Sequence, residues 1–249
     1  MILLTAGDSW TQGDSPSQTL NWDAEPNLDW YNIVPNFGYH LNHAKHILYK
    51  FYDSPVWPKV LGEKLGVETW NAGRMGASNR QILVSVYNSI EYLKQMDKKD
   101  IFVVIQLSSN LRYSNLKVEE EKMSCSFESM KFMPVSGIEQ LYKQNLIDLI
   151  LLQTYLNNQK IPHLIYSGFD NELSNNWRYL PDYKNLDMRY VYKKTFQPVF
   201  RHYIENTFNT NWTSGTDEWF KAAHPTDKSH IAWGEHLYEY IKENYEDFS

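Results

Sequence analysis

Residues 1–13, MILLTAGDSWTQG, are the stretch from which the rest of the chain can be interpreted. Residues 2–4 form a short apolar run that predicts a buried strand, and Gly7, Asp8 and Ser9 favour a turn directly after it. Ser9 is therefore expected at the carboxyl end of a strand, where open α/β sheets bind ligands, and it is a candidate nucleophile. A Gly-Asp-Ser turn alone is weak evidence, because turns favour all three residue types.

The composition limits the classes of protein and partner. A chain of 249 residues, 42% hydrophobic and 22% charged, can bury a sizeable core and need not form more than one domain. The net charge of -6, without a run of Lys and Arg, argues against nucleic acid or an anionic membrane as the partner. We expect a soluble protein, because we find neither a signal peptide nor an apolar run of roughly 18 residues.

Cysteine content bears on metals and cofactors. Cys125 is the only cysteine, which excludes an internal disulfide and a multi-cysteine metal site. His40, His43 and His46 recur at a spacing of three, but no carboxylate lies among them at ligand spacing. We therefore expect a helix face rather than a metal site at these histidines, and neither a metal nor a cofactor in the protein.

Further apolar stretches predict more strands, at 67–70, 101–107 and 162–167. The run 101–107, IFVVIQL, is continuous enough for a central parallel strand. The strand at 67–70 leads into a glycine-bearing turn at 71–79, and the strand at 101–107 leads to Asn110. Because the carboxyl ends of parallel strands share one sheet edge, this turn and Asn110 are expected to lie close to Ser9.

Helical periodicity is present between the predicted strands. One helix begins near Pro58 and ends at Gly66, and a longer one follows a cap at Ser78 or Asn79. The stretch 138–158 is a strongly apolar helix, and 191–208 is compatible with another. In the last helix, apolar positions are expected to pack on the sheet: Ile231, Leu237, Tyr240 and Ile241.

Three stretches interrupt the regular pattern, at about 14–54, 112–137 and 168–215. They are rich in Pro, Asn, Asp and aromatic residues or in mixed charge, and they show no sustained period. We find no internal repeat and no linker, so residues 1–249 are expected to form a single domain with these three insertions.

The C-terminal stretch contributes a candidate base. His224 stands beside Pro225 and just before the last helix, a position well suited to reach Ser9. A neutral imidazole there can take the hydroxyl proton and later return it to the leaving group.

Taken together, these blocks resemble the SGNH (GDSL-type) hydrolases. The four residues that name the family correspond to Ser9, Gly76, Asn110 and His224, in the family's order. The resemblance runs from residue 2 to about 240. The stretches WPKVLGEKLG and NAGRMGASNRQI are especially similar to family members met in bacteriophage genomes.

The resemblance implies a three-layer α/β/α sandwich with a parallel, flavodoxin-like sheet of about five strands. It implies ester hydrolysis through an acyl-enzyme on Ser9, with His224 as the base. The N–H groups of Ser9 and Gly76 and the amide of Asn110 would form the oxyanion hole. It also implies a cytoplasmic or virion-associated protein that acts on a small-molecule or carbohydrate ester.

The sequence departs from the family pattern at two places. Ser108 and Leu111 stand where the family has Gly before and Asp after the asparagine. The family also has an Asp two or three residues before the histidine, where this chain has Lys221, Ala222 and Ala223.

The absent acid leaves several arrangements open. Either His224 works in a dyad oriented by a backbone carbonyl, or an acid such as Asp217 or Glu218 reaches it from farther off, or activity is weak; Asp227 is a further possible third member. A literal Asp-x-x-His is present at Asp227 and His230. We favour His224 as the base, because a His-Pro followed by a second His six residues later is similar to the family's last block.

Three functions remain open on this basis. The first is an esterase that removes O-acyl groups, O-acetyl above all, from carbohydrate. The second is a related sugar-binding or structural protein without efficient turnover, which the absent acid supports. The third is an acyltransferase that uses the same acyl-enzyme.

Overall fold

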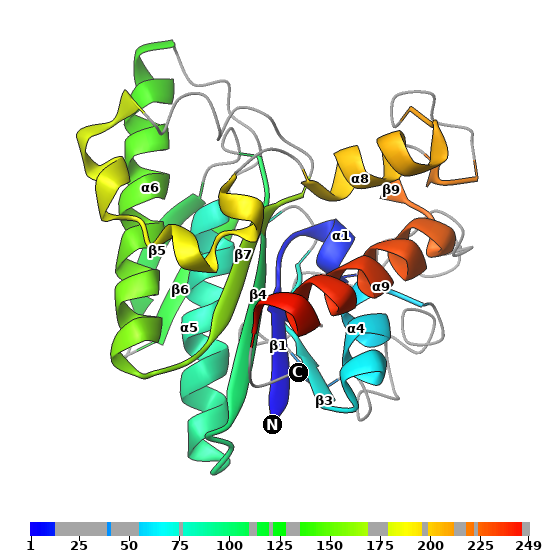
Figure 1. Cartoon of the computed structure of the whole chain (residues 1–249). Helices are drawn as coiled ribbons and strands as arrows, with labels where there is room; N and C mark the ends of the chain where they lie inside the picture. Colours follow the sequence, from blue (N-terminus) through cyan, green and yellow to red (C-terminus); the bar gives the residue numbers. More distant parts are fainter. Residues whose placement is uncertain are drawn as a thin grey trace, which may run out of the picture.

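A computed structural model describes residues 1–12, 39–40, 55–74, 77–109, 114–119, 122–127, 135–168, 179–195, 199–211, 218–221 and 224–245. A five-stranded sheet of order β2-β3-β1-β4-β7 forms its centre (Figure 1). The strands are β1 Ile2–Ala6, β2 Tyr39–His40, β3 Glu68–Asn71, β4 Ile101–Leu107 and β7 His163–Ser167.

Four of these strands are parallel, and β2 pairs antiparallel with β3 at the sheet edge. The parallel strands lie in the order second, first, third, fourth along the chain, which is the flavodoxin-like order. The expected parallel, flavodoxin-like sheet of about five strands is therefore confirmed, with four parallel strands and the short antiparallel strand β2 at its edge. The predicted helix at His40, His43 and His46 is wrong for His40, because this residue lies in the strand β2. His43 and His46 lie outside the described residues.

Helices cover both faces of the sheet, as Figure 1 shows, so the protein has the expected three α/β/α layers. The helices are α1 Ser9–Gln12, α4 Trp57–Leu65, α5 Asn79–Gln95, α6 Val135–Asn158, α8 Val199–Phe208 and α9 Asp227–Asn244. The 3-10 turns are η2 Pro181–Asn185, η3 Met188–Tyr190 and η4 Tyr192–Lys194. Two small ladders pair β5 Ser114–Glu119 with β6 Lys122–Phe127, and β8 Phe220–Lys221 with β9 His224–Pro225.

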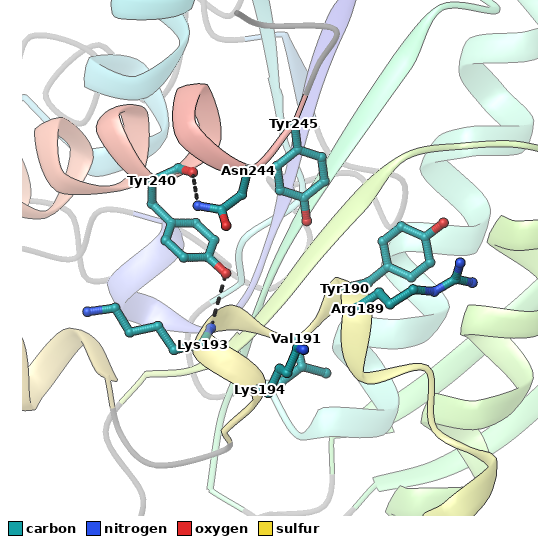
Figure 2. A pocket seen from close by; sticks show the side chains of 8 residues that line it. All are labelled: Arg189, Tyr190, Val191, Lys193, Lys194, Tyr240, Asn244 and Tyr245. Atoms are coloured by element: carbon teal, nitrogen blue, oxygen red, sulfur yellow. Dashed lines mark hydrogen bonds between the residues drawn. The ribbon is translucent and has the colours of Figure 1, made fainter.

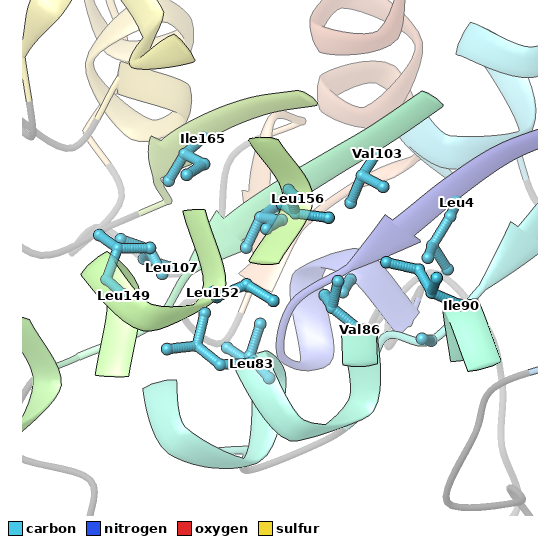
Figure 3. Packing of buried hydrophobic residues seen from close by; sticks show 14 of the residues in the cluster. Leu4, Leu83, Val86, Ile90, Val103, Leu107, Leu149, Leu152, Leu156 and Ile165 are labelled. Atoms are coloured by element: carbon cyan, nitrogen blue, oxygen red, sulfur yellow. The ribbon is translucent and has the colours of Figure 1, made fainter. Parts of the chain in front are cut away.

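Alternation along the central strands divides the buried side chains into two cores. Leu4 and Val103 pack with α5 and α6 on one face, as Figure 3 shows. Leu3 and Val104 belong to the other core, with aromatic residues of α4, α8 and α9. Successive side chains of a strand point to opposite faces, so fully buried strands such as β4 are apolar throughout.

Local signals fix several helix ends. Ser78 caps α5 in a capping box: its hydroxyl accepts from the backbone N–H of Gln81, and the Gln81 side chain accepts from the Ser78 N–H. Pro58 lies in the first turn of α4, and Gly66 ends that helix with φ of 68°. This left-handed conformation favours glycine, so both ends of α4 lie where the sequence predicts them.

Two expectations for helices need correction. The stretch 191–208 is not one helix, because η4 is followed by α8, which begins only at Val199. In α9, Leu237 and Ile241 are buried as expected, but Ile231 is 38% exposed and does not pack in the core. Among the helices of the described part, none is long and apolar enough to cross a membrane.

The described parts of the three predicted insertions contain regular structure. The stretch 14–54 contains the edge strand β2, and 112–137 contains the β5–β6 hairpin. The stretch 168–215 contains the three 3-10 turns and α8. The single-domain organisation remains an expectation.

Candidate active site

The turn that carries Ser9 is tightly packed. After β1, Gly7 and Asp8 lead directly into α1, whose first residue is Ser9. A Cβ atom on Gly7 would lie 2.0 Å from Thr11 Oγ1 and 3.0 Å from Gln106 Cβ, so no side chain fits there. The Gly7 carbonyl accepts a hydrogen bond of 2.9 Å from the Arg74 N–H. This hydrogen bond joins the turn after β1 to the turn after β3.

Ser9 meets His224 at the carboxyl edge of the sheet. Ser9 Oγ lies 3.2 Å from His224 Nε2, although the two residues are 215 positions apart. Ser9 is buried and His224 is partly buried. This distance is within hydrogen-bond reach, so the imidazole can accept the hydroxyl proton when Nε2 is unprotonated.

The neighbouring carboxylate of Asp8 organises the turn. Asp8 Oδ1 accepts hydrogen bonds from the Trp10 N–H at 3.1 Å and from Gln106 Nε2 at 3.0 Å. Its Oδ2 accepts from Ser108 Oγ at 2.8 Å. Asp8, Gln106 and Ser108 are fully buried, and a buried charge needs such partners. The carboxylate thus links the turn after β1 to the end of β4.

The same network continues into the C-terminal helix. Gln106 Oε1 accepts from the Tyr166 hydroxyl at 3.3 Å, and that hydroxyl accepts from Trp233 Nε1 at 3.0 Å. Burial raises the pKa of Tyr166 well above its usual range, so its hydroxyl stays protonated. A continuous chain of hydrogen bonds therefore runs from α9 through β7 and β4 to Asp8.

Two asparagines fix the turns that flank Ser9. Asn71 Nδ2 donates to the Thr11 carbonyl at 2.9 Å, and Asn71 Oδ1 accepts from the Gly73 N–H at 2.8 Å. Asn79 Oδ1 accepts from the Ser108 N–H at 2.7 Å. The turns after β1, β3 and β4 are thus held together by side chains. Gly76 and Asn110, the other two predicted oxyanion donors, lie outside the described residues.

His224 is presented by a short antiparallel ladder. In this ladder β8 pairs with β9, and Lys221 lies opposite His224. The next residues lead into α9, where the Thr226 N–H donates to the Trp219 carbonyl at 2.8 Å and Thr226 Oγ1 to the Glu218 carbonyl at 2.6 Å. These bonds fix the backbone on which His224 stands.

The three candidate acids differ in their placement. Asp217 lies outside the described residues, and Glu218 forms an ion pair with Lys228. Asp227 is partly buried in the first turn of α9. The third member of the site therefore stays a prediction.

His230 has a different place from His224. It is fully buried, and its Nδ1 accepts a hydrogen bond of 3.4 Å from the N–H of Trp57, the first residue of α4. Burial, and secondarily the nearby His224, lower the pKa of His230 to about 3. The ring stays neutral and joins α9 to α4, which fits the capping or packing role that the sequence suggested. The structure brings His224, and not His230, to Ser9.

Sequence reasoning missed the buried polar chain behind the turn. Gln106 interrupts an otherwise apolar strand, and this was the signal that could have revealed it. A polar side chain in the middle of a sheet requires buried partners. Asp8, Ser108 and Tyr166 are these partners.

Comparison with known proteins supports the fold. No family model matches the sequence, and no curated protein is significantly similar to it. A carbohydrate esterase, whose active site is described as having divergent catalytic and non-catalytic binding functions, is 9% identical at a TM-score of 0.51. That match covers 100% of this chain and 66% of the other.

Two other solved structures match at lower scores. The acetyl xylan esterase of the rumen bacterium Butyrivibrio proteoclasticus is 14% identical over 97% of this chain and 63% of its own, with a TM-score of 0.48. A psychrotrophic esterase from Pseudoalteromonas sp. is 15% identical over 97% of both chains, with a TM-score of 0.45. At such identities a likeness concerns the fold alone. The chain therefore has an α/β fold with a parallel sheet, of the kind found in a carbohydrate esterase.

Proposed function

We propose that the protein is an SGNH hydrolase that removes O-acyl groups, with O-acetyl esters of carbohydrate as the substrate class. The observation that carries this proposal is the 3.2 Å contact between Ser9 Oγ and His224 Nε2. A serine and a histidine so placed, at the carboxyl edge of a parallel sheet, are the nucleophile and base that acyl transfer needs.

The proposed first step forms an acyl-enzyme. Ser9 Oγ attacks the ester carbonyl while His224 Nε2 takes the hydroxyl proton. The tetrahedral intermediate then collapses, the C–O bond to the alcohol breaks, and His224 returns the proton to the leaving oxygen. In the second step His224 removes a proton from water, the resulting nucleophile attacks the acyl carbon, and the proton goes back to Ser9.

The oxyanion would be held by the N–H groups of Ser9 and Gly76 and by the Asn110 amide. This assignment follows the family resemblance, and the described residues support it indirectly. Asn79 and Asp8 hold the backbone and side chain of Ser108, two positions before Asn110. An oxyanion hole requires donors that are oriented before charge develops, and the held position of Ser108 supports such a role for Asn110.

The direct test is hydrolysis of p-nitrophenyl acetate and of acetylated xylan. We expect a burst of nitrophenol that equals the enzyme concentration, followed by turnover. Ser9→Ala and His224→Ala should each lower kcat by about 10⁴-fold or more. Ser89→Ala is a matched control, because this buried serine hydrogen-bonds within α5 to the Ser85 carbonyl. Equal rates in the wild type and Ser9→Ala would refute the proposal.

One observation favours a second candidate, a carbohydrate-binding protein without efficient turnover. Lys221 lies opposite His224 in the β8–β9 ladder, three positions before it, where the family has its acid. The sequence therefore has no carboxylate at this position to orient the imidazole. In that case acetylated xylan oligomers would bind equally to the wild type and Ser9→Ala, and no burst would appear.

A further inference from the structure

A hollow lies at the end of α9 that is opposite to His224. It has a volume of about 570 Å³ and lies between the end of α9 and the segment 189–194 that follows the sheet edge (Figure 2). The helix α9 begins close to His224, and its 18 residues span about 27 Å. Tyr240, Asn244 and Tyr245, which line the hollow, belong to the opposite end of this helix. Its size is within the range of ordinary small-ligand sites. The proposed hydrolase chemistry does not use it.

Aromatic rings surround this hollow. Figure 2 shows Tyr190, Tyr240 and Tyr245 around the space, above the backbone of η4. The rings are fixed: Tyr245 donates its hydroxyl hydrogen to the His163 carbonyl at 2.7 Å, and the Lys193 N–H donates to the Tyr240 hydroxyl at 3.1 Å. The Tyr190 ring stacks on His163, with 4.0 Å between centroids. Such pre-ordered rings lose little freedom when a ligand stacks on them.

The charged side chains that line the hollow are all cationic, although the whole chain has a net charge of -6. They are Arg189, Lys193 and Lys194. Asp187, outside the lining, pairs with the Arg189 guanidinium at 2.6 Å. Across the described ranges no carboxylate lies within ion-pair distance of Lys193 or Lys194, and both residues are exposed. The Lys193 ammonium lies over the Tyr192 ring, 5.3 Å from its centroid, so within the described part of the chain neither lysine is neutralised by a carboxylate.

The backbone beneath the hollow is strained. Lys193 and Lys194 have φ values of 46° and 53°, a left-handed conformation that side-chain-bearing residues rarely adopt twice in succession. Strain of this kind is retained where the surroundings require it, and it is concentrated at ligand sites. Here it turns the chain so that the Lys193 N–H reaches Tyr240 while both lysines stay at the surface.

We propose that this hollow binds an anionic sugar, a saccharide ring bearing a carboxylate, sulfate or phosphate group. The ring would stack on the tyrosines, and the anion would meet Lys193 and Lys194. Asn244 can orient a sugar hydroxyl, because its Nδ2 donates to the Tyr240 carbonyl at 2.8 Å while its Oδ1 has no partner among the described residues. The site is independent of the proposed hydrolase function.

The test is calorimetric titration of the full chain with trigalacturonate. Maltotriose is the neutral sugar, sulfate is the anion alone, and adenosine monophosphate is an anion with a different ring. We expect trigalacturonate to bind at least 10-fold more tightly than each of the other three, and more weakly as salt is added. Absence of binding, or equal or tighter binding of sulfate or of the nucleotide, would overturn the proposal.

A matched pair of variants locates the site. Lys193→Gln with Lys194→Gln should weaken trigalacturonate binding about 10-fold or more. Lys98→Gln with Lys99→Gln removes the same charge from two adjacent lysines that already pair with Glu68 and Asp97, and it should leave affinity unchanged. Equal weakening by both variants would show a diffuse charge effect and refute the site. Ser9→Ala should bind like the wild type, so failure of the hydrolase proposal would not affect this result.

Discussion

Ser108 Oγ donates a hydrogen bond of 2.8 Å to Oδ2 of Asp8, and this contact joins the Ser9 turn to the loop that leads to Asn110. Both residues are fully buried. Together with the hydrogen bond from the Ser108 N–H to Asn79, this hydroxyl links the turn that carries the proposed nucleophile to the end of β4, two positions before Asn110.

Ser108→Ala should lower both stability and turnover. It removes a donor from a buried carboxylate, which should cost about 1.5 to 3 kcal/mol in the free energy of unfolding. We expect kcat to fall about 10-fold or more with little change in KM, because the displaced loop matters most in the transition state. The control Ser89→Ala should change neither kcat nor KM. A loss of stability with unchanged kcat would show that the contact only supports the fold.

The identity of the third member can be tested by replacing each acid with its amide. If His224 works in a dyad, Asp217→Asn, Glu218→Gln and Asp227→Asn should each leave kcat within a few-fold of the wild type. Loss of about 10⁴-fold in one correctly folded variant would instead identify the orienting acid, because the histidine would be left in the wrong tautomer. We expect Glu218→Gln to have little effect, because this carboxylate already pairs with Lys228.

Stability should fall as the pH is lowered below neutrality, partly through His163. Burial lowers the pKa of this histidine to about 4, whereas an unfolded histidine titrates near 6.5. Between these values the unfolded chain binds more protons, so the contribution is fully present above about pH 6.5 and is lost as the pH falls towards 4. At pH 5 the free energy of unfolding should be about 2 kcal/mol lower than at neutral pH because of His163.

Urea unfolding at pH 7.5 and pH 5 measures this effect. His163→Phe keeps a ring against Tyr190 but cannot titrate, so it should lose about 2 kcal/mol less than the wild type between the two pH values. His202 is more exposed than His163, so His202→Gln should keep most of the wild-type change in the free energy of unfolding between pH 7.5 and pH 5. An equal loss in the wild type and His163→Phe would contradict the assignment.

Two glycines should respond differently to alanine. At Gly7 a Cβ would collide with Thr11 and Gln106, so Gly7→Ala should cost about 1 to 3 kcal/mol and, by displacing Ser9, lower kcat about 100-fold. At Gly66 the space is open but φ is 68°, so Gly66→Ala should cost about 1 to 2 kcal/mol and leave kcat unchanged. Thermal unfolding measures the loss of stability in both variants, and kcat shows which variant also disturbs the geometry of the site.

Most of the sheet and its flanking helices could be predicted because their signals are local. The run 101–107 is β4, and the proline and glycine at the two ends of α4 predict its bounds. The strand β2 has only two residues and depends on pairing with β3, so no local pattern indicates it. The predicted helix over 191–208 failed at Lys193 and Lys194, whose left-handed φ values the sequence does not signal.

The Ser9–His224 pair was predictable because two strand-end and helix-start motifs place both residues at one sheet edge. Their contact agrees with that prediction, and their catalytic role is still a proposal. The buried chain through Gln106 and Tyr166 was missed, because hydrogen bonds between distant strands leave no periodic pattern. Only the isolated polar residue in an apolar strand pointed to it.

The separation of 215 positions between Ser9 and His224 has a consequence for the order of folding. Ser9 follows the strand β1, whereas His224 precedes α9 and Trp233 lies within that helix. Closing so long a loop comes late in folding, because its entropy must be offset by contacts that are not yet made. During refolding, we expect the proposed esterase activity to return no earlier than amide protection in α9, because Ser9 gains its partner His224 only when this C-terminal region docks.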